Sequence, residues 1–234
     1  MHLRTEVRSV RGESGTGVQL VTSGPDGEGV IEGTDLLIGV GRTPNTAGIG
    51  LERAGVKVTE TGYIAVDEHL ATSAPGVWAM GECAGSPQFT HVAFDDFRVV
   101  YDALTGGSRA TAGRLVPYVM FTDPEFARVG LNETEARRRG IGYRLLTMPM
   151  EAVLRTHTLS EPRGFLKMLI AADGDEILGF SAFGAEASEM MATVQTAMVG
   201  HVPYTALQSA IYAHPTMAEG ITYLLRTQPA EPAG

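Results

Sequence analysis

The sequence is poor in cysteine and in basic side chains. Its single thiol, Cys83, excludes an internal disulfide, and one free cysteine in 234 residues fits a reducing cytoplasm. Lys and Arg number 18 against 27 Asp and Glu, which gives a net charge of −9. Clustered positive charge is what binds phosphate backbones, so this balance argues against nucleic acid as a partner.

Long apolar runs and one glycine motif are also missing. No apolar run approaches the roughly 18 residues of a membrane-spanning helix. The first residues, MHLRTEVRSV, lack the apolar segment of a signal peptide. We therefore expect no membrane association. The sequence contains no Gly-x-Gly-x-x-Gly, the fingerprint that lets a backbone approach a dinucleotide pyrophosphate.

The first half of the chain predicts short strands and one helix. Alternation of apolar and polar residues indicates strands at 4–10 and 17–22, each followed by a glycine-rich turn. Within 35–45 we expect an apolar strand that runs into a Gly-Arg-Thr-Pro-Asn turn at 41–45, and further strands are expected at 62–72 and 77–85. A helix is expected to begin at Thr90, as its N-cap, and to end at Gly106-Gly107, because apolar residues recur at helical spacing between them.

The composition shifts to small and polar residues around 108–116, where we expect a domain boundary. Asn132, with Glu135 three residues on and Gly140 as terminator, predicts a helix with a capping box. Periodicity predicts strands at 116–122, 143–149, 164–171 and 176–184, and helices at 187–198, 204–211 and 215–225.

His214 and Glu219, in "AHPTMAEG", form a candidate acid–base pair. His214 precedes Pro215, so we expect extended backbone at the histidine and a helix that begins behind it. A carboxylate beside one imidazole nitrogen fixes the tautomer and raises the basicity of the other nitrogen. The alternative is a helix-capping histidine with a solvent-exposed glutamate, and spacing alone favours this alternative.

Two further stretches are candidate ligand contacts. "TSAPGVWAMGECAG" (72–85) places Glu82 after Gly81 at the end of a predicted buried strand, where ligands dock in α/β sheets. A carboxylate there can accept hydrogen bonds from a sugar-like hydroxyl, although the stretch also fits a simple turn. "FTHVAFDD" (89–96) opens the predicted helix, whose free N–H groups can face an anionic or electron-rich group.

In order and spacing, these stretches resemble the flavoprotein disulfide reductases, or pyridine nucleotide-disulfide oxidoreductases. That family includes dihydrolipoamide dehydrogenase, glutathione reductase and mercuric reductase. "GRTPN" (41–45) is similar to the turn that closes the family's NAD(P) domain, and residues 72–85 are similar to its second FAD motif. "PYVMFTDPEFARVGLNETEA" (117–136) and "HPTMAEG" (214–220) are similar to the start and the end of its interface domain. The mercuric-reductase-like members look most similar.

The resemblance implies FAD and NAD(P) as cofactors of the complete enzyme. Glu82 would bond the ribityl chain of FAD, at a position where the family usually has Asp. The N-terminus of the helix near residue 90 would point at the flavin and stabilise negative charge on it. The cofactor-binding candidates are Gly41, Arg42, Gly81, Glu82, Thr90, His91 and Val92. No metal ligands are implied.

The resemblance also implies an active site shared across a homodimer. His214 would be the acid–base catalyst, oriented by Glu219, against the flavin and the redox cysteines of the partner subunit. The family begins with a glycine fingerprint for FAD, a redox cysteine pair and a second fingerprint for NAD(P), and none of these occurs here. Cys83 cannot replace a pair of thiols and is expected to pack as a small buried residue.

The implied fold is α+β, a C-terminal interface domain with an antiparallel sheet flanked by helices, preceded by partial α/β segments of the FAD and NAD(P) domains. Residues 1–45 would end the NAD(P)-binding domain, 46–112 would be the returning segment of the FAD-binding domain, and 113–234 the dimerisation domain. Because residues 1–112 lack their sheet neighbours, we expect them to be disordered, rearranged or domain-swapped.

The expected function is that of the C-terminal portion of a dimeric FAD-dependent NAD(P)H oxidoreductase, which passes electrons through flavin to a disulfide or a metal ion. The chain alone is expected to be inactive and to need a partner that carries the N-terminal half. The alternative is a non-catalytic dimerisation module of the same fold.

Overall fold

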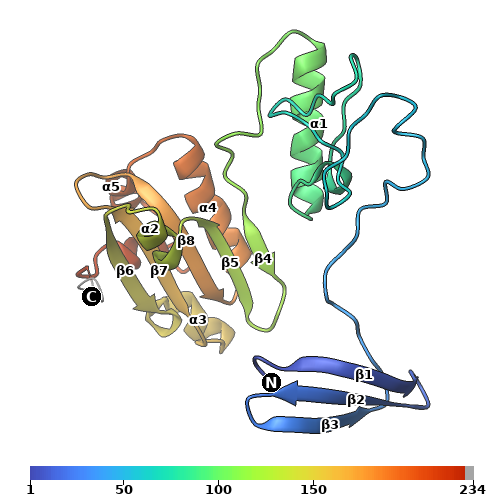
Figure 1. Ribbon diagram of the computed structural model, residues 1–234. Helices are drawn as coiled ribbons and strands as arrows, with labels where there is room; N and C mark the ends of the chain where they lie inside the picture. Colours follow the sequence, from blue (N-terminus) through green and yellow to red (C-terminus); the bar gives the residue numbers. More distant parts are fainter. Residues whose placement is uncertain (230–234) are drawn as a thin grey trace.

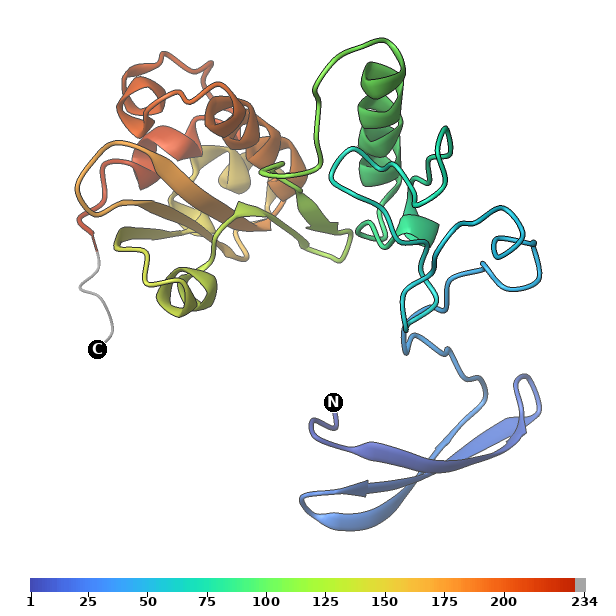
Figure 2. The same cartoon turned by 45° about the horizontal axis from the view of Figure 1, so that its top comes forward.

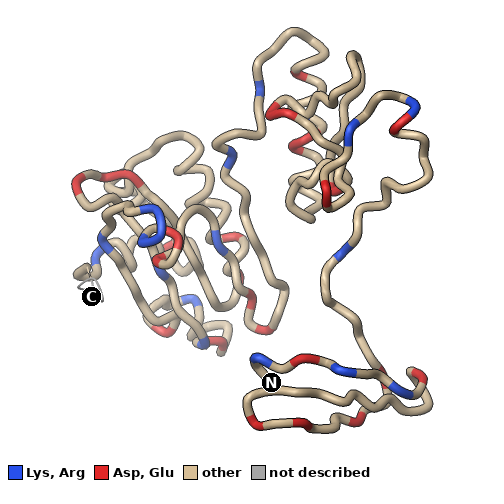
Figure 3. The backbone as a smooth tube through the Cα atoms, viewed as in Figure 1, with Lys and Arg blue, Asp and Glu red and all other residues tan. Residues whose placement is uncertain are grey.

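The computed structural model describes residues 1–229 and has three parts in chain order. A small three-stranded sheet comes first, an irregular segment with one long helix follows, and a domain built on a five-stranded sheet ends the chain (Figures 1 and 2). Acidic and basic residues are interspersed along all three parts (Figure 3). No helix in the described part of the chain combines the length and the apolar character that crossing a membrane requires.

The first sheet contains β1 (Glu6–Glu13), β2 (Gly17–Gly24) and β3 (Gly27–Gly33), paired antiparallel in that order. The first two strands confirm the prediction. The third strand was interpreted as part of a glycine-rich turn. Four of the ten residues 24–33 are glycine, and glycine has a low propensity for β-strands. In the structure these residues form a regular antiparallel sheet.

The segment between the first sheet and the long helix forms almost no regular strand. The apolar strand expected before the 41–45 turn is wrong: Leu37 and Val40 are 95% and 90% exposed and belong to no strand. The strands expected at 62–72 and 77–85 appear only as isolated bridges, among them Val66 with Thr72 and Ala71 with Trp78. A strand is stabilised by its neighbours, and the described residues offer these segments no partner strand.

A small second core nevertheless holds this segment together. Its buried members are Val56, Ile64, Ala74 and Ala79, and the half-buried Cys83 packs against them. The segment ends in the one-turn helix η1 (Glu82–Ala84) and in α1 (Thr90–Leu104).

Helix α1 confirms the predicted helix, with two differences. Thr90 is its first residue and Phe89 its N-cap, which makes no side-chain capping bond. The buried face carries Val92, Asp96 and Val99, whereas the apolar residues that predicted the helix are largely exposed: Phe97, Tyr101 and Leu104.

The C-terminal domain confirms the predicted antiparallel sheet flanked by helices. Its strand order is β4-β5-β8-β7-β6, and every pair is antiparallel. The strands are β4 (Tyr118–Met120), β5 (Glu125–Gly130), β6 (Tyr143–Pro149), β7 (Phe165–Ala171) and β8 (Ile177–Gly184). The helices are α2 (Glu133–Arg138), η2 (Met150–Ala152), α3 (Leu154–Leu159), α4 (Ala187–Val199), α5 (Tyr204–Ser209) and α6 (Gly220–Leu224).

One face of this sheet carries the main core. Helix α4 packs against β5 and β8, α6 packs against β6 and β7, and Phe180 and Leu166 are buried between the layers. Helix α2 lies on the other face and has the predicted capping box between Asn132 and Glu135. Helix α6 is shorter than predicted, so Pro215 lies before it and not in its first turn.

Candidate functional site

The loop before α6 brings His214 and Glu219 together. Nδ1 of His214 lies 3.1 and 3.0 Å from the two carboxylate oxygens of Glu219. A carboxylate only accepts hydrogen bonds, so Nδ1 carries the proton and Nε2 is left as the basic nitrogen. The histidine side chain is 60% exposed and the glutamate side chain only 14%. The glutamate is therefore a sheltered anchor, and the histidine presents its ring to solvent.

Thr216 fixes the shape of this loop. Its hydroxyl donates to the carbonyl of Ala213 at 2.8 Å and accepts from the N–H of Glu219 at 3.3 Å. Glu219 is itself the N-cap of α6, so the helix holds the carboxylate at a fixed point. The helix-capping alternative for His214 does not fit, because the histidine bonds the glutamate side chain and Glu219 is not solvent-exposed.

Tyr223, one turn after Glu219, is a member of this cluster that the sequence argument missed. Hydrogen bonding from the Tyr223 side chain is the largest influence on the Glu219 carboxyl and lowers its pKa. Burial opposes this, and the bond and charge of His214 and the backbone bond of the Thr216 loop lower the pKa further. The same contact raises the pKa of Tyr223. The spacing of four between two polar residues on a short helix was the signal available in the sequence.

The cofactor-binding candidates of the first half form a second cluster. Arg42 donates from Nη1 to Oε1 of Glu82 at 2.9 Å, so the GRTPN turn reaches the second candidate motif across 40 residues of sequence. Gly41 beside it is exposed and has φ +109°, and Gly81 is buried. The Glu82 side chain is 40% exposed, and Oε2 has no hydrogen-bond partner among the described residues.

The N-terminus of α1 lies directly after this cluster in the chain. Thr90 and His91 are exposed, whereas Val92 is buried and its N–H already donates to the carbonyl of Phe89 at 3.1 Å. His91 donates from Nε2 to the carbonyl of Pro117 at 3.1 Å and stacks on Phe89. The first N–H groups of the helix, at residues 90 and 91, are the ones that can face a ligand.

A buried ion pair that the sequence argument missed supports this region. Asp96 on α1 is fully buried, accepts from the N–H of Gly81 at 2.7 Å and from Nη1 of Arg114 at 2.5 Å. In the sequence, Asp96 lies on the same helix face as the apolar residues Val92 and Val99. A carboxylate at such a position needs a charged or hydrogen-bonding partner, and this pattern could have indicated the ion pair.

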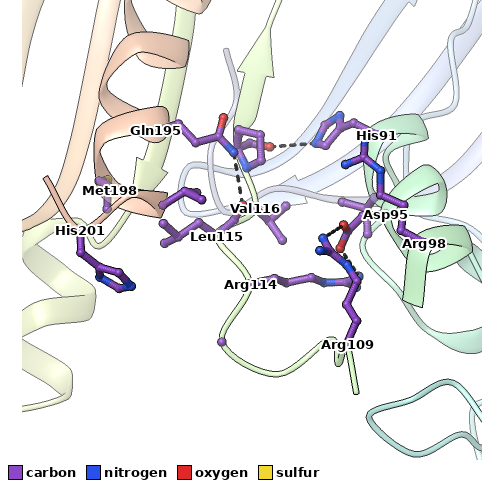
Figure 4. Close-up of a pocket in the computed structure, with 14 residues that line it drawn as sticks. His91, Asp95, Arg98, Arg109, Arg114, Leu115, Val116, Gln195, Met198 and His201 are labelled. Atoms are coloured by element: carbon purple, nitrogen blue, oxygen red, sulfur yellow. Dashed lines mark hydrogen bonds and ion pairs between the residues drawn. The ribbon is translucent and has the colours of Figure 1, made fainter. Parts of the chain in front are cut away.

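A cavity of about 590 Å³ separates α1 from α4 (Figure 4). Its lining includes His91, Asp95 and Arg114 on one side and Gln195 and His201 on the other. The candidates His91 and Val92 line it, whereas Glu82 and His214 do not, so the cavity does not join the two candidate motifs. Among residues 1–229, no group of three potential metal ligands is found.

The two candidate clusters are separate in the fold. In both ribbon views the segment around α5 and the C-terminus lies beyond α4, on the side of the sheet away from α1 (Figures 1 and 2). A single copy of the chain therefore does not bring His214 to the N-terminus of α1.

The sequence matches two family descriptions in succession. Residues 1–96 match the pyridine nucleotide-disulphide oxidoreductases, and residues 116–225 match the dimerisation domain of the same family. The chain belongs to the pyridine nucleotide-disulphide oxidoreductases. The resemblance stated from the sequence is thus confirmed.

Three relatives illustrate the relationship. A probable pyridine nucleotide-disulfide oxidoreductase of Escherichia coli, RclA, is 39% identical over 191 residues, which are 81% of this chain and 43% of the relative. The mercuric reductase of Streptomyces lividans is 33% identical over 228 residues, 97% of this chain and 48% of the relative. A dihydrolipoyl dehydrogenase of Thermus scotoductus is 39% identical over 186 residues, 80% of this chain and 40% of the relative. The chain spans about half the length of the curated relatives it matches.

Solved structures of this oxidoreductase family confirm the fold. The HOCl-induced flavoprotein disulfide reductase RclA of Escherichia coli superposes with a TM-score of 0.85 at 33% identity, over 95% of this chain and 51% of that chain. Its Cu(II) complex superposes with a TM-score of 0.84. Because nearly the whole chain superposes, residues 1–112 keep the arrangement of that relative, and the rearrangement that we expected is not observed.

Proposed function

We propose that the chain is the C-terminal part of a dimeric FAD-dependent NAD(P)H oxidoreductase, whose electrons pass to a disulfide or a metal ion. The observation that carries the proposal is the geometry of the dyad. Nδ1 of His214 donates to a sheltered carboxylate, the histidine side chain is 60% exposed, and Nε2 has no hydrogen-bond partner among the described residues. This arrangement suits a histidine that takes up and releases a proton from a group outside its own domain.

The domain assignment follows the same division. Residues 1–45 are assigned to the NAD(P)-binding domain, 46–112 to the FAD-binding domain and 113–234 to the dimerisation domain. The separate cores support this, since the buried apolar cluster of the second part shares no residue with that of the third.

The residues present fit one side of FAD. Glu82 has one carboxylate oxygen without a partner among the described residues, and this oxygen could accept a hydrogen bond from a ribityl hydroxyl. Gly81 beside it has a backbone conformation that is essentially restricted to glycine. The exposed start of α1 at Thr90 and His91 offers N–H groups and the positive end of a helix dipole. For the pyrophosphate of FAD, the sequence offers no comparable binding residues, because it contains no Gly-x-Gly-x-x-Gly motif. The rest of the cofactor site is therefore assigned to the half of the family's fold that these 234 residues do not contain.

Each residue then has a defined task. FAD, when bound, carries the electrons between NAD(P)H and the acceptor. Glu82 would accept from a ribityl hydroxyl through Oε2, while Arg42 holds Oε1. The N-terminus of α1 stabilises negative charge that faces it. Glu219 orients His214, which holds or moves a proton at Nε2.

Two exposed apolar surfaces among the described residues support an assembly in which further protein surface covers this chain. One is the face of α1 that carries Phe97, Tyr101 and Leu104, and the other contains Leu37 and Val40 in the segment before the GRTPN turn. Exposed apolar patches of this kind mark surfaces that are covered in an assembly. A homodimer through the dimerisation domain would bring His214 to the flavin side of the other subunit, which one copy alone does not do.

Reconstitution tests the proposal. The chain is mixed with a polypeptide that supplies the first half of a relative, and NAD(P)H oxidation is measured with disulfide and metal-ion acceptors. In the active mixture, His214→Ala should lower turnover by about 10²–10⁴, the usual contribution of a positioned acid–base group. The control is His157→Ala, which removes an exposed histidine that contacts a backbone carbonyl and no carboxylate. Unchanged turnover in His214→Ala would give the dyad a structural role, and a stable dimer without flavin would favour the dimerisation module.

A further inference from the structure

Asp96 is a fully buried carboxylate whose two partners come from two other segments of the chain. It lies on the second turn of α1. Oδ2 accepts from the backbone N–H of Gly81 at 2.7 Å, and Oδ1 accepts from Nη1 of Arg114 at 2.5 Å. A buried carboxylate is tolerated only when charged and hydrogen-bonding partners satisfy it, and here both kinds are present.

The partner on the loop side is a residue in a special conformation. Gly81 has φ 75° and ψ −155°, a region that is essentially restricted to glycine. Its carbonyl accepts from the N–H of Ala84 at 3.1 Å, which starts the η1 turn. Glu82 is the first residue of that turn, so the position of Gly81 decides where the Glu82 carboxylate lies.

The partner on the linker side belongs to the connection between the two larger parts. Arg114 is half-buried and also reaches Oδ2 of Asp95 and Oγ of Ser86, both at 3.4 Å. One guanidinium thus contacts α1 twice and the end of the Gly81–Ser86 loop once. Figure 4 shows Arg114 extended from the linker towards Asp95 on the face of α1.

We propose that Asp96, held by Arg114, is a positioning residue that locks the Gly81–Glu82 loop against α1. It acts on the cofactor contact only through Glu82, and it keeps that carboxylate and the N-terminus of α1 in a fixed mutual position. The link to FAD rests on the proposed function, whereas the lock itself is a property of this chain. Asp95, one residue before, pairs with Arg109 and Arg114 but accepts no bond from the loop.

The lock is tested by amide hydrogen exchange on the full chain. Asp96→Ala removes the acceptor of the Gly81 N–H, and the exchange of that amide should rise by about tenfold or more. Asp96→Asn keeps the shape and a neutral acceptor, so the rise should be smaller but measurable. Asp95→Asn is the matched control, because it removes the same charge from the neighbouring position; Gly81 exchange should change by less than about twofold. Amides of β7 and β8 report global stability and should be unchanged in all three variants.

The outcomes separate the lock from the cofactor role. Unchanged Gly81 exchange in the folded Asp96→Ala or Asp96→Asn protein overturns the proposal, as does an equal rise in β7 and β8, which would mean a general loss of stability. In the reconstituted enzyme, the dissociation constant of FAD is measured by flavin fluorescence. Weaker binding in both Glu82→Ala and Asp96→Ala supports positioning through Glu82. If Glu82→Ala binds FAD as the parent does, the proposed function of Glu82 fails while the exchange result on Asp96 still stands.

Discussion

Leu166→Ala is a perturbation that tests whether the parts of the chain are independent. Leu166 is the second residue of β7, is fully buried, and pairs with Met148 on one side and Ala182 on the other. Removal of a leucine side chain from such a site leaves a cavity and costs about 2–5 kcal/mol. The upper part of this range is expected here, because strands on both sides prevent the site from collapsing.

The assay is urea unfolding combined with hydrogen exchange. The main core around Leu166 includes residues of α4 and α6 but none of the second core around Val56 and Ile64. We therefore expect lower protection throughout 118–225 and unchanged protection in β1, β2 and β3. Val10→Ala, at an exposed position of β1, is the control and should leave the main domain within about 0.5 kcal/mol of the parent. Equal loss of protection in the first sheet would refute the reasoning, since the chain would then unfold as one unit and the boundary near residue 113 would be wrong.

Two further predictions concern the dyad and the capping box. Tyr223→Phe removes the largest influence that lowers the Glu219 pKa, so this pKa should rise towards its ordinary value of 4.5, as followed by carboxyl NMR titration. Because the pKa of Glu219 is lowered in the folded chain, its contacts stabilise the chain above the ordinary pKa, and this contribution is lost as pH falls through the lowered value; an unmoved titration would contradict the contact. Asn132→Ala removes the acceptor of the Glu135 N–H and should lower the free energy of unfolding by about 1 kcal/mol in urea, whereas Asn132→Asp should keep the cap.

The dimerisation domain was the most predictable part of the fold. The strand predicted at 143–149 is β6, because apolar and polar residues alternate and a complete sheet is present to receive them. The strand predicted before the 41–45 turn has the apolar composition but no neighbouring strand among the described residues, so Leu37 and Val40 are exposed. Apolar periodicity indicates that one face of a segment is buried in the assembled protein. It does not indicate whether the residues that cover this face belong to the same chain.

The candidate site was only partly predictable. The five-residue spacing suggested that His214 and Glu219 could meet, and the structure adds which nitrogen is bonded. The pairing of Arg42 with Glu82 and the bond from Gly81 to Asp96 join residues far apart in sequence. No local pattern encodes such contacts, because they depend on how the loops fold back on α1.

The visible absorption spectrum tests the central claim most directly. The purified chain is incubated with excess FAD and dialysed, once alone and once with a polypeptide that supplies the first half of a relative. We expect a colourless chain alone and a retained flavin spectrum in the mixture, weakened by Glu82→Ala. Absence of flavin from a stable complex of the two halves, or full retention in Glu82→Ala, would contradict the claim that this chain forms one side of the flavin site.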